Sequence, residues 1–474
     1  MKIMLILPAA EHLRINSSHD EVPNRKMLRF SVLGLTTVAA LTPMGHKVTL
    51  YDENVEPVDL WADADVVGIS FMTGLANRAY ELAAHFKSRG IITVAGGFHP
   101  TLCTQEAMQH FDIVVAGQAE GIWPQVLNDI QNKRYKKLYE NRNAADLADV
   151  PIPRRSLLDY KKEHYATTYA VQVGRGCQHK CRFCSVTAFF NHNYQTRPIE
   201  NVLAELGDVP KHFMFVDDNI IADVEYAKKL FAAMIPMKKR WISQCSIEIA
   251  EDKELLDLAY KAGCRGLFVG IETTSKANLE NMDKAFNQSD STGSPQADDY
   301  IRKIAIIRKR GIGVQAGMIV GMDNDDAAVF ERTLKFLDKA KIDALQLAIL
   351  TPQPGTPLRD EFEKAGRIID NDWSHYDYRH VVIEPKLMTS HQLQNGADWL
   401  YNKFYGLHKI IFRTVRALFK FGPLTAYLVY RLNMNYRYDN LREGIVGFNP
   451  ARDVKPRINS NKRFIFNMPT AKIF

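Results

Sequence analysis

The sequence is poor in cysteine and has no long uninterrupted apolar run. Six cysteines in 474 residues are too few for a disulfide framework in a chain of this length. We therefore expect a reducing, cytoplasmic setting. No stretch reaches the roughly 18 consecutive apolar residues that a membrane-spanning helix needs. The apolar N-terminal run MKIMLILPAA gives way at once to EHLR, which is typical of a buried first strand and not of a signal peptide.

Acidic residues are scarce toward the C-terminus. From residue 401 onward, 14 lysines and arginines stand against 3 aspartates and glutamates, so this segment carries +11 in a chain of net charge +7. With 46% hydrophobic and 24% charged residues, the chain as a whole is typical of globular proteins. Its length predicts at least two domains.

Short apolar segments alternate with helical patterns over residues 1–140. Residues 1–7, 47–52, 66–70, 91–97 and 112–117 read as strands, which predicts a doubly wound, Rossmann-like parallel sheet. Ligands of such sheets bind beyond the carboxyl ends of the strands. The glycines there permit close backbone approach to a bulky ligand, or serve only as turns. The expected ligand-binding residues in these loops are Ser70, Thr73, Gly74, Gly96, Gly97, His99, Gly117 and Glu120.

A second alternation follows residues 141–168, which show no sustained periodicity and predict a linker. Six strand-helix steps in series predict a complete or partial parallel barrel of the TIM type, whose chemistry lies at the carboxyl ends of the strands. We therefore expect a Rossmann-like domain at 1–140, the linker at 141–168, the barrel at 169–385 and a helical, basic extension at 386–474.

Three cysteines, Cys177, Cys181 and Cys184, follow the first barrel strand with the spacing C-x3-C-x2-C. Thiolates so close in sequence can bind one metal centre, and sulfur ligands favour zinc or an iron-sulfur cluster. A structural zinc site would need a fourth ligand, for which His179 and His192 are candidates. A catalytic cluster leaves that fourth position open, and the placement at a barrel mouth favours catalysis.

The run from Gly174 to Cys184, with an aromatic residue directly before the third cysteine, resembles the signature of the radical S-adenosylmethionine (SAM) superfamily. The resemblance implies a partial (β/α)6 barrel and a 4Fe-4S cluster held by the three thiolates, with SAM on the fourth iron. Reduction would cleave SAM to methionine and a 5'-deoxyadenosyl radical that abstracts a substrate hydrogen. An external one-electron reductant of the flavodoxin or ferredoxin type is implied as a partner.

The resemblance also implies SAM contacts where the sequence matches the family. These are Phe183 at the adenine, Asp217, Asp218 and Asn219 at the amino group, Glu272 at the ribose, and Gln315, Gly317 and Ile319 along the fifth-strand adenine wall. The simpler alternative for the carboxylates is that they cap the helices that follow.

The N-terminal domain resembles that of the cobalamin-binding subclass of the superfamily, and the resemblance covers residues 1–385. The DxHxxG motif that supplies a cobalt ligand in other corrinoid proteins is absent, since His12 lies in AEHLR and His99 in GFHPT. Much of the subclass also lacks that motif. The alternative is a degenerate domain that only covers the barrel. Methylthiotransferases carry three further cysteines in their N-terminal domain, whereas this region has only Cys103.

The enzyme that this resemblance implies is a cobalamin-dependent methyltransferase acting on an unactivated carbon of a lipid or secondary metabolite. One SAM would methylate cobalamin, and a second would supply the radical. Two alternatives stay open. One is a radical SAM oxidative cyclase or rearrangement enzyme that transfers no methyl group, and the other is a non-catalytic corrinoid- or metal-binding protein.

Residues 403–420 predict a basic amphipathic helix, with Phe404, Leu407, Ile411, Val415 and Leu418 on one side and Lys409, Arg413, Arg416 and Lys420 on the other. Such a helix either packs on the barrel with a solvated basic face, or makes peripheral contact with an anionic membrane through residues 403–430. We expect no nucleic acid partner, because the aromatics do not interleave with the basic ridge. From about residue 435 we expect a poorly structured or peripheral tail.

Overall fold

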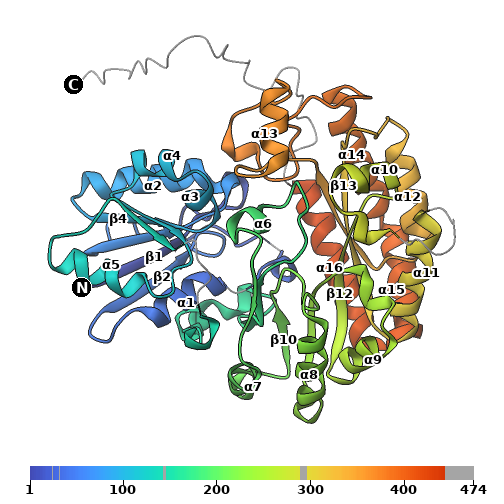
Figure 1. Ribbon diagram of the computed structural model, residues 1–474, viewed down its shortest axis with the longest axis horizontal. Coiled ribbons are helices and arrows are strands. Elements are labelled where there is room, and N and C mark those ends of the chain that lie inside the picture. Colours follow the sequence, from blue (N-terminus) through green and yellow to red (C-terminus); the bar gives the residue numbers. More distant parts are fainter. Residues whose placement is uncertain (24, 31, 142–145, 289–295, 443–474) are drawn as a thin grey trace.

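The computed structural model describes residues 1–442 except 24, 31, 142–145 and 289–295. Two parallel six-stranded sheets account for its architecture, one at the left and one at the right of Figure 1. The N-terminal sheet has the order β2-β1-β3-β4-β5-β6. Its strands are β1 (Lys2–Leu7), β2 (Lys47–Asp52), β3 (Val66–Ser70), β4 (Ile92–Gly96), β5 (Ile113–Gly117) and β6 (Leu138–Asn141).

Helices cover both faces of the N-terminal sheet because its central strands are apolar on both sides. Along β1, Ile3 and Leu5 pack into one core, and Met4 and Ile6 into another. The first core includes side chains from α1 (Leu33–Leu41) and α5 (Trp123–Gln131), and the second includes α2 (Ala76–Ser88) and α4 (Thr104–His110). A short helix, α3 (Phe98–Leu102), follows β4. The strand order reverses between β1 and β3, which places the expected binding crevice there.

The five strands predicted for residues 1–140 are present, and β6 is an additional one. Its sequence, LYEN, has a single buried residue, so it lacks the apolar pattern of its neighbours.

The second sheet, the barrel sheet, has the order β14-β13-β12-β11-β10-β7 and is parallel throughout. Its strands are β7 (Ala170–Val171), β10 (His212–Phe215), β11 (Arg240–Cys245), β12 (Cys264–Glu272), β13 (Gly313–Val320) and β14 (Ala344–Ile349). The first and last strands lie at opposite edges, so the barrel is partial and open, as the resemblance implies. The helices of this part of the chain are α6 (Ser185–Phe189), α7 (Ile199–Asp208), α8 (Val224–Met234), α9 (Lys253–Lys261), α10 (Lys276–Asn281), α11 (Gln296–Lys309), α12 (Val329–Lys339) and α13 (Pro357–Lys364).

The first predicted barrel strand divides in two. After β7 the chain leaves the sheet and forms β8 (Gly174–Gly176), which pairs in antiparallel fashion with β9 (Tyr194–Thr196). The break has a physical cause, because the buried Asp217 carboxylate accepts hydrogen bonds from the amides of Val173 and Gly174, at 3.0 and 2.6 Å. Those amides therefore need no neighbouring strand.

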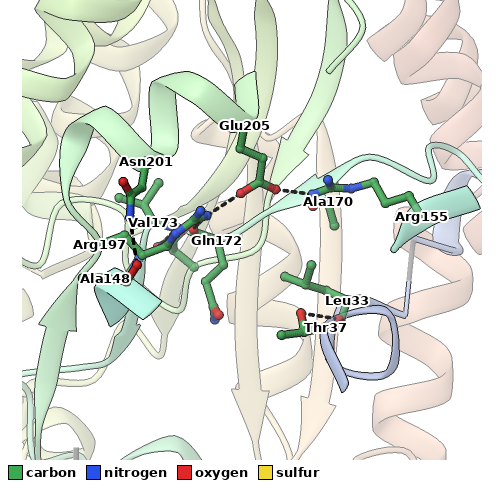
Figure 2. Close-up of polar contacts among 12 residues, drawn as sticks. Leu33, Thr37, Ala148, Arg155, Ala170, Gln172, Val173, Arg197, Asn201 and Glu205 are labelled. Carbon is green, nitrogen blue, oxygen red and sulfur yellow. Dashed lines mark hydrogen bonds and ion pairs between the residues drawn. The ribbon is translucent and has the colours of Figure 1, made fainter. Parts of the chain in front are cut away.

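The described part of the linker is tied to the barrel by a buried carboxylate. Glu205 of α7 is 1% exposed and binds both Arg155, in a 3-10 helix at Arg155–His164, and Arg197 (Figure 2). The two guanidinium groups also donate to the carbonyls of Ala170 and Gln172, on either side of the end of β7. This triad fixes the segment that leads to the cysteines.

Three helices complete the described chain: α14 (Ser390–Phe404), α15 (Leu407–Phe421) and α16 (Pro423–Arg442). The prediction of a poorly structured tail from about residue 435 is wrong for residues 435–442. Asn435 accepts a hydrogen bond from the amide of Met27 at 2.8 Å, and Asp439 pairs with Arg25 at 2.9 Å, so this half of α16 binds the N-terminal segment. The rest of the predicted tail lies outside the described residues.

The predicted alternative in which the amphipathic helix packs on the barrel with a solvated basic face is wrong for most of that face. Arg413 is buried, and Arg416 and Lys409 are half-buried against the loop that precedes β14 and the end of α12, whereas Lys420 is exposed. The apolar side of the helix is the exposed one. Among the described helices, none has the length and apolar content that crossing a bilayer requires.

Candidate cluster and cofactor site

The three cysteines lie in the loop between β8 and α6, and Cys184 is the residue that caps the start of α6. All three are free thiols, with Cys181 buried and the other two partly exposed. Gly176, directly before Cys177, has a φ of +83°, and a side chain there would overlap the carbonyl of Asn193 in the neighbouring strand region. The glycine of the motif is therefore required by the tight hairpin that supports the loop.

The spacing of the three thiols argues against a single zinc ion. Sulfur atoms that share one tetrahedral zinc lie about 3.8 Å apart, given a Zn–S bond of about 2.3 Å. Within the described residues, the only set of three ligand atoms within 4.8 Å of one another is at His99, Cys103 and Glu106. Of the proposed fourth ligands, His179 stacks on Phe286 and His192 is exposed. An iron-sulfur cluster, in which each thiolate binds a different iron, fits a wider spacing.

A buried ion pair accompanies the thiols. Lys284 lies 2.8 Å from Glu272 and is nearly inaccessible to solvent. Burial acts to lower the pKa of Lys284, but the Glu272 carboxylate and Cys181 together raise it above its ordinary value. Burial raises the pKa of the Cys181 thiol to about 12, and Lys284 opposes that rise. The ammonium therefore favours thiolate at Cys181, the form that binds metal.

Glu272 itself stands in a strained backbone. Its φ is +64°, in the left-handed region that residues other than glycine rarely adopt, and the register of β12 with β13 shifts there. Such strain is typical of functional positions. The shift turns the Glu272 carboxylate toward Lys284 at the carboxyl end of β12.

The three polar residues after β10 differ in what they bind. Asp217 is saturated by backbone amides, as described above, and Asn219 accepts a hydrogen bond from the amide of Ser246 at 3.1 Å. Asp218 receives a backbone hydrogen bond from Gly176 and is close enough to Cys177 and Cys184 to influence their charge. Burial raises the pKa of both aspartates to about 7. Asp218 is thus the carboxylate best placed beside the cysteines.

The expected adenine contacts are partly brought together. Phe183 and Ile319 border the same apolar cluster, which includes Met282, Met322 and Leu350. The amide group of Gln315 donates to the hydroxyl of Tyr436 in α16, 2.7 Å away, so it is already engaged by the C-terminal helix. The backbone of Gly317 packs against the ring of Phe268, where a side chain would collide.

The expected cobalamin loops lie together at the carboxyl edge of the N-terminal sheet. Ser70 and Gly96 are in register at the ends of β3 and β4, and Gly117 ends β5. Gly97 has a φ of +99°, and a side chain there would collide with Ser70 and the backbone of Phe71. Thr73 and Gly74 lie in a short turn that packs against the backbone of Tyr376, a residue near the C-terminal end of the barrel domain. Because most of these residues are glycines or have small side chains, a ligand at this edge would meet mainly backbone atoms.

His99 follows the end of β4, but its side chain is buried. Its ring is fully buried among Phe71 and Trp373, and its Nε2 lies 2.9 Å from the hydroxyl of Tyr80. Glu106, which shares this network, accepts hydrogen bonds from Tyr80 and Trp373. The histidine is thus held by aromatic packing.

The N-terminal domain contacts the segment around the cysteine loop directly. Arg175, between the two glycines of the motif, forms an ion pair with Glu120 at 2.6 Å and donates to Gln118 at 2.8 Å. Phe98 of α3 stacks on Phe189 of α6, with ring centroids 4.5 Å apart, and Figure 1 shows α6 facing the N-terminal domain. A small pocket opens here, lined by residues of both domains: Gln118, Asn141, Arg175, Phe189, Phe190, Asn193 and Gln195.

Comparison with known families and proteins agrees with this geometry. The model of the radical SAM superfamily matches residues 171–337, and that of the B12 binding domain matches residues 28–127. The chain is 29% identical to bacteriochlorophyllide d C-12(1)-methyltransferase from Chlorobaculum tepidum, covering 80% of this chain and 82% of that one. It is 25% identical to hopanoid C-2 methylase from Rhodopseudomonas palustris over 72% and 65% of the two chains. An anaerobic magnesium-protoporphyrin IX monomethyl ester cyclase from Cereibacter sphaeroides matches at 24% identity over 66% and 55%.

Two solved structures share the fold. The cobalamin-dependent radical enzyme OxsB, with aqua-cobalamin and SAM bound, aligns with a TM-score of 0.65 and 13% identity over 92% of this chain and 71% of that one. The methyltransferase TsrM from Kitasatospora setae, with cobalamin and a [4Fe-4S] cluster bound, aligns with a TM-score of 0.59 and 15% identity over 77% and 75%.

Fold and site together define a radical enzyme with a corrinoid domain in front of its barrel. The chain carries a radical SAM domain and a B12 binding domain, over residues 171–337 and 28–127. The predicted fold class is confirmed, and so is the cofactor set of SAM and cobalamin, with the 4Fe-4S cluster that the superfamily implies. The relatives support methyl transfer as its reaction.

Two residues of the site escaped the sequence-based assignment. Lys284 follows β12 by twelve positions, in a segment without strand or helix periodicity, so only the fold brings it to Glu272. Arg175 lies within the recognised motif, but its partner Glu120 is 55 residues away in another domain. The sequence offered one signal for Arg175: it is an arginine between two glycines, directly before the first of the three cysteines.

Proposed function

We propose that the protein methylates an unactivated carbon of a large polycyclic substrate at the junction of its two domains. The observation that carries this proposal is the Arg175–Glu120 ion pair, which ties the cysteine loop directly to the expected cobalamin loop. Radical generation and methyl supply can then serve one substrate. The proposed division is residues 1–140 for cobalamin, 141–168 as linker, 169–385 for cluster and SAM, and 386–474 as extension.

The residues of this chain divide the work by their chemistry. Cys177, Cys181 and Cys184 would hold the cluster, which when bound supplies the electron that cleaves SAM. Asp218 is placed to accept from the SAM ammonium, and Lys284 to donate to the SAM carboxylate, because charge-assisted bonds of this kind are strong in a buried site. The glycine-rich edge at Gly96, Gly97 and Gly117 would admit the flat face of cobalamin to backbone contact.

The relatives guide the substrate class. One acts on a bacteriochlorophyllide and another on a hopanoid, by their names, and both substrates are large polycyclic molecules. We propose the same class here. We also propose a reducing, cytoplasmic setting, in keeping with six free cysteines, and an external one-electron donor of the flavodoxin or ferredoxin type.

The test uses anaerobically reconstituted protein with reductant, cobalamin and methyl-labelled SAM. Bacteriochlorophyllide d and a hopanoid are offered separately, with Cys181→Ser as the control variant, and products are followed by mass spectrometry. A product carrying the label, absent with the control, is expected for one of the two classes. A substrate that is oxidised or cyclised without gaining the label would favour the cyclase alternative and contradict methyl transfer.

A further inference from the structure

The solvent-facing side of α15 is apolar over its whole length. Its exposed side chains, which we call the outer face, are Leu407, Ile411, Phe412, Val415, Leu418 and Phe419. Phe412 and Phe419 are 68% and 86% exposed. These positions recur within one half of the helix circumference, and His408 is the single polar residue among them. Apolar surface gathered in this way marks an interaction site.

The inner side of α15 holds the helix in this orientation. Arg413 is buried, lies 4.0 Å from the Phe404 ring centroid, and donates to the Phe404 carbonyl at 2.8 Å. Arg416 donates to the carbonyls of Lys341 and Ile342, at 2.8 and 2.9 Å. Rolling the helix to hide its apolar face would break these contacts and leave the carbonyls of Phe404, Lys341 and Ile342 without their guanidinium donors.

The next helix extends the apolar surface. α16 packs alongside α15 after the turn at Gly422 and exposes Leu424, Tyr427, Leu428 and Tyr430 near its start. Tyrosine, with an apolar ring and a polar hydroxyl, suits a boundary between hydrocarbon and water. The two helices therefore offer an interfacial surface, although neither spans a membrane.

The positive charge around the outer face indicates that its partner is anionic. No aspartate or glutamate occurs between Trp399 and Tyr438, while Lys403 and Lys420 are exposed and Arg431 is partly exposed. An anionic bilayer complements apolar side chains flanked only by cations. A symmetric contact with a second copy would bring the same cation-flanked faces together and meet repulsion.

We propose that the outer face of α15, with the start of α16, lies in the headgroup region of an anionic membrane and holds the enzyme there as a peripheral protein. Binding does not depend on catalysis. Its use, the delivery of a membrane-dissolved polycyclic substrate, rests on the proposed function. The two can therefore fail separately.

The experiment is flotation of the full-length protein with vesicles of phosphatidylcholine alone or mixed with phosphatidylglycerol. The variant Ile411→Ser/Phe412→Ser/Phe419→Ser removes apolar area from the outer face, and Met44→Ser/Trp61→Ser removes exposed apolar area from the N-terminal domain as the matched control. Wild type and control should bind the mixed vesicles, less so at high salt. The triple variant should bind at least tenfold more weakly with an unchanged melting temperature.

Three results would overturn the proposal. The first is a wild type that floats with neither vesicle, and the second is a triple variant that floats as well as wild type. Alternatively, light scattering could show a wild-type dimer that the triple variant dissociates, which would make a second copy the occupant of the outer face.

Discussion

The two six-stranded sheets are both parallel, but they differ in strand order and in the chemistry at their carboxyl edges. Where β3, β4 and β5 end, the N-terminal edge offers Ser70, Gly96 and Gly117, whereas β2 ends at the buried carboxylates Asp52 and Glu53. The barrel edge offers three thiols, buried carboxylates and a buried lysine. The first suits a large cofactor held by shape and backbone approach, whereas the second suits a metal cluster and a charged ligand. The residues at the strand ends, and not the parallel arrangement by itself, therefore decide what each edge can bind.

Removing one cluster thiol should deprive the barrel edge of its iron-sulfur cluster, the feature that most distinguishes it from the N-terminal edge. We expect Cys181→Ser to lose bound iron and all reductive SAM cleavage, because the remaining two thiolates cannot hold the cluster. Iron analysis and 5'-deoxyadenosine formation measure this. Cys103→Ser, in the N-terminal domain, is the matched control and should keep both. Undiminished SAM cleavage by Cys181→Ser would show that the cluster is elsewhere.

Breaking the support of the barrel edge should cost the most stability. Glu205→Gln leaves Arg155 and Arg197 buried without their carboxylate, and such losses destabilise by about 3–5 kcal/mol. The free energy of unfolding in urea measures the change. Glu200→Gln, on the exposed side of the same helix, should change it little. Equal effects of the two variants would mean that the triad in Figure 2 contributes no more than a surface charge.

Removing the buried cation should weaken SAM binding without emptying the cluster. Lys284→Met deletes one charge-assisted contact, which predicts about 10- to 100-fold weaker binding. Calorimetry with SAM on the reconstituted protein measures the dissociation constant, and iron content should stay normal. Lys335→Met, an exposed lysine on α12, is the control. A normal dissociation constant for Lys284→Met would remove Lys284 from the SAM site.

The pH dependence of stability should reveal Asp218 in the cluster-free protein. Its folded pKa of about 7 lies above its unfolded value of about 3.8, so the folded state binds more protons between these values. Stability should therefore fall as pH rises from about 4 to about 7, by up to about 1.4 kcal/mol per pH unit for this group. Urea unfolding across this range should show a shallower fall in Asp218→Asn than in the control Glu225→Gln. Identical slopes would contradict a perturbed Asp218.

Local patterns predicted most of the fold. The alternating apolar runs of β1 to β5 and the six barrel strands are each readable within a few residues, and Cys177, Cys181 and Cys184 carry their meaning in their spacing. The split between β7 and β8 was not readable, because it depends on Asp217, more than 40 residues further on.

Long-range contacts account for the other misses. The pairing of Lys284 with Glu272 and of Arg175 with Glu120 exists only after folding. The helical pattern is confirmed for residues 407–420, while residues 403 and 404 end the preceding helix, α14; periodicity does not say which side of a helix faces inward. Usually the apolar side does, and here the acceptors Asp338 and the carbonyls of residues 341 and 342 draw the basic side inward instead.

The central claim is that the two edges act in one reaction, and the products of SAM test it most directly. With substrate, reductant and cobalamin, the enzyme should form 5'-deoxyadenosine and S-adenosylhomocysteine in equal amounts, one of each per methylated product. Without cobalamin, S-adenosylhomocysteine should disappear while 5'-deoxyadenosine persists. Formation of S-adenosylhomocysteine and methylated product without any 5'-deoxyadenosine would contradict the account.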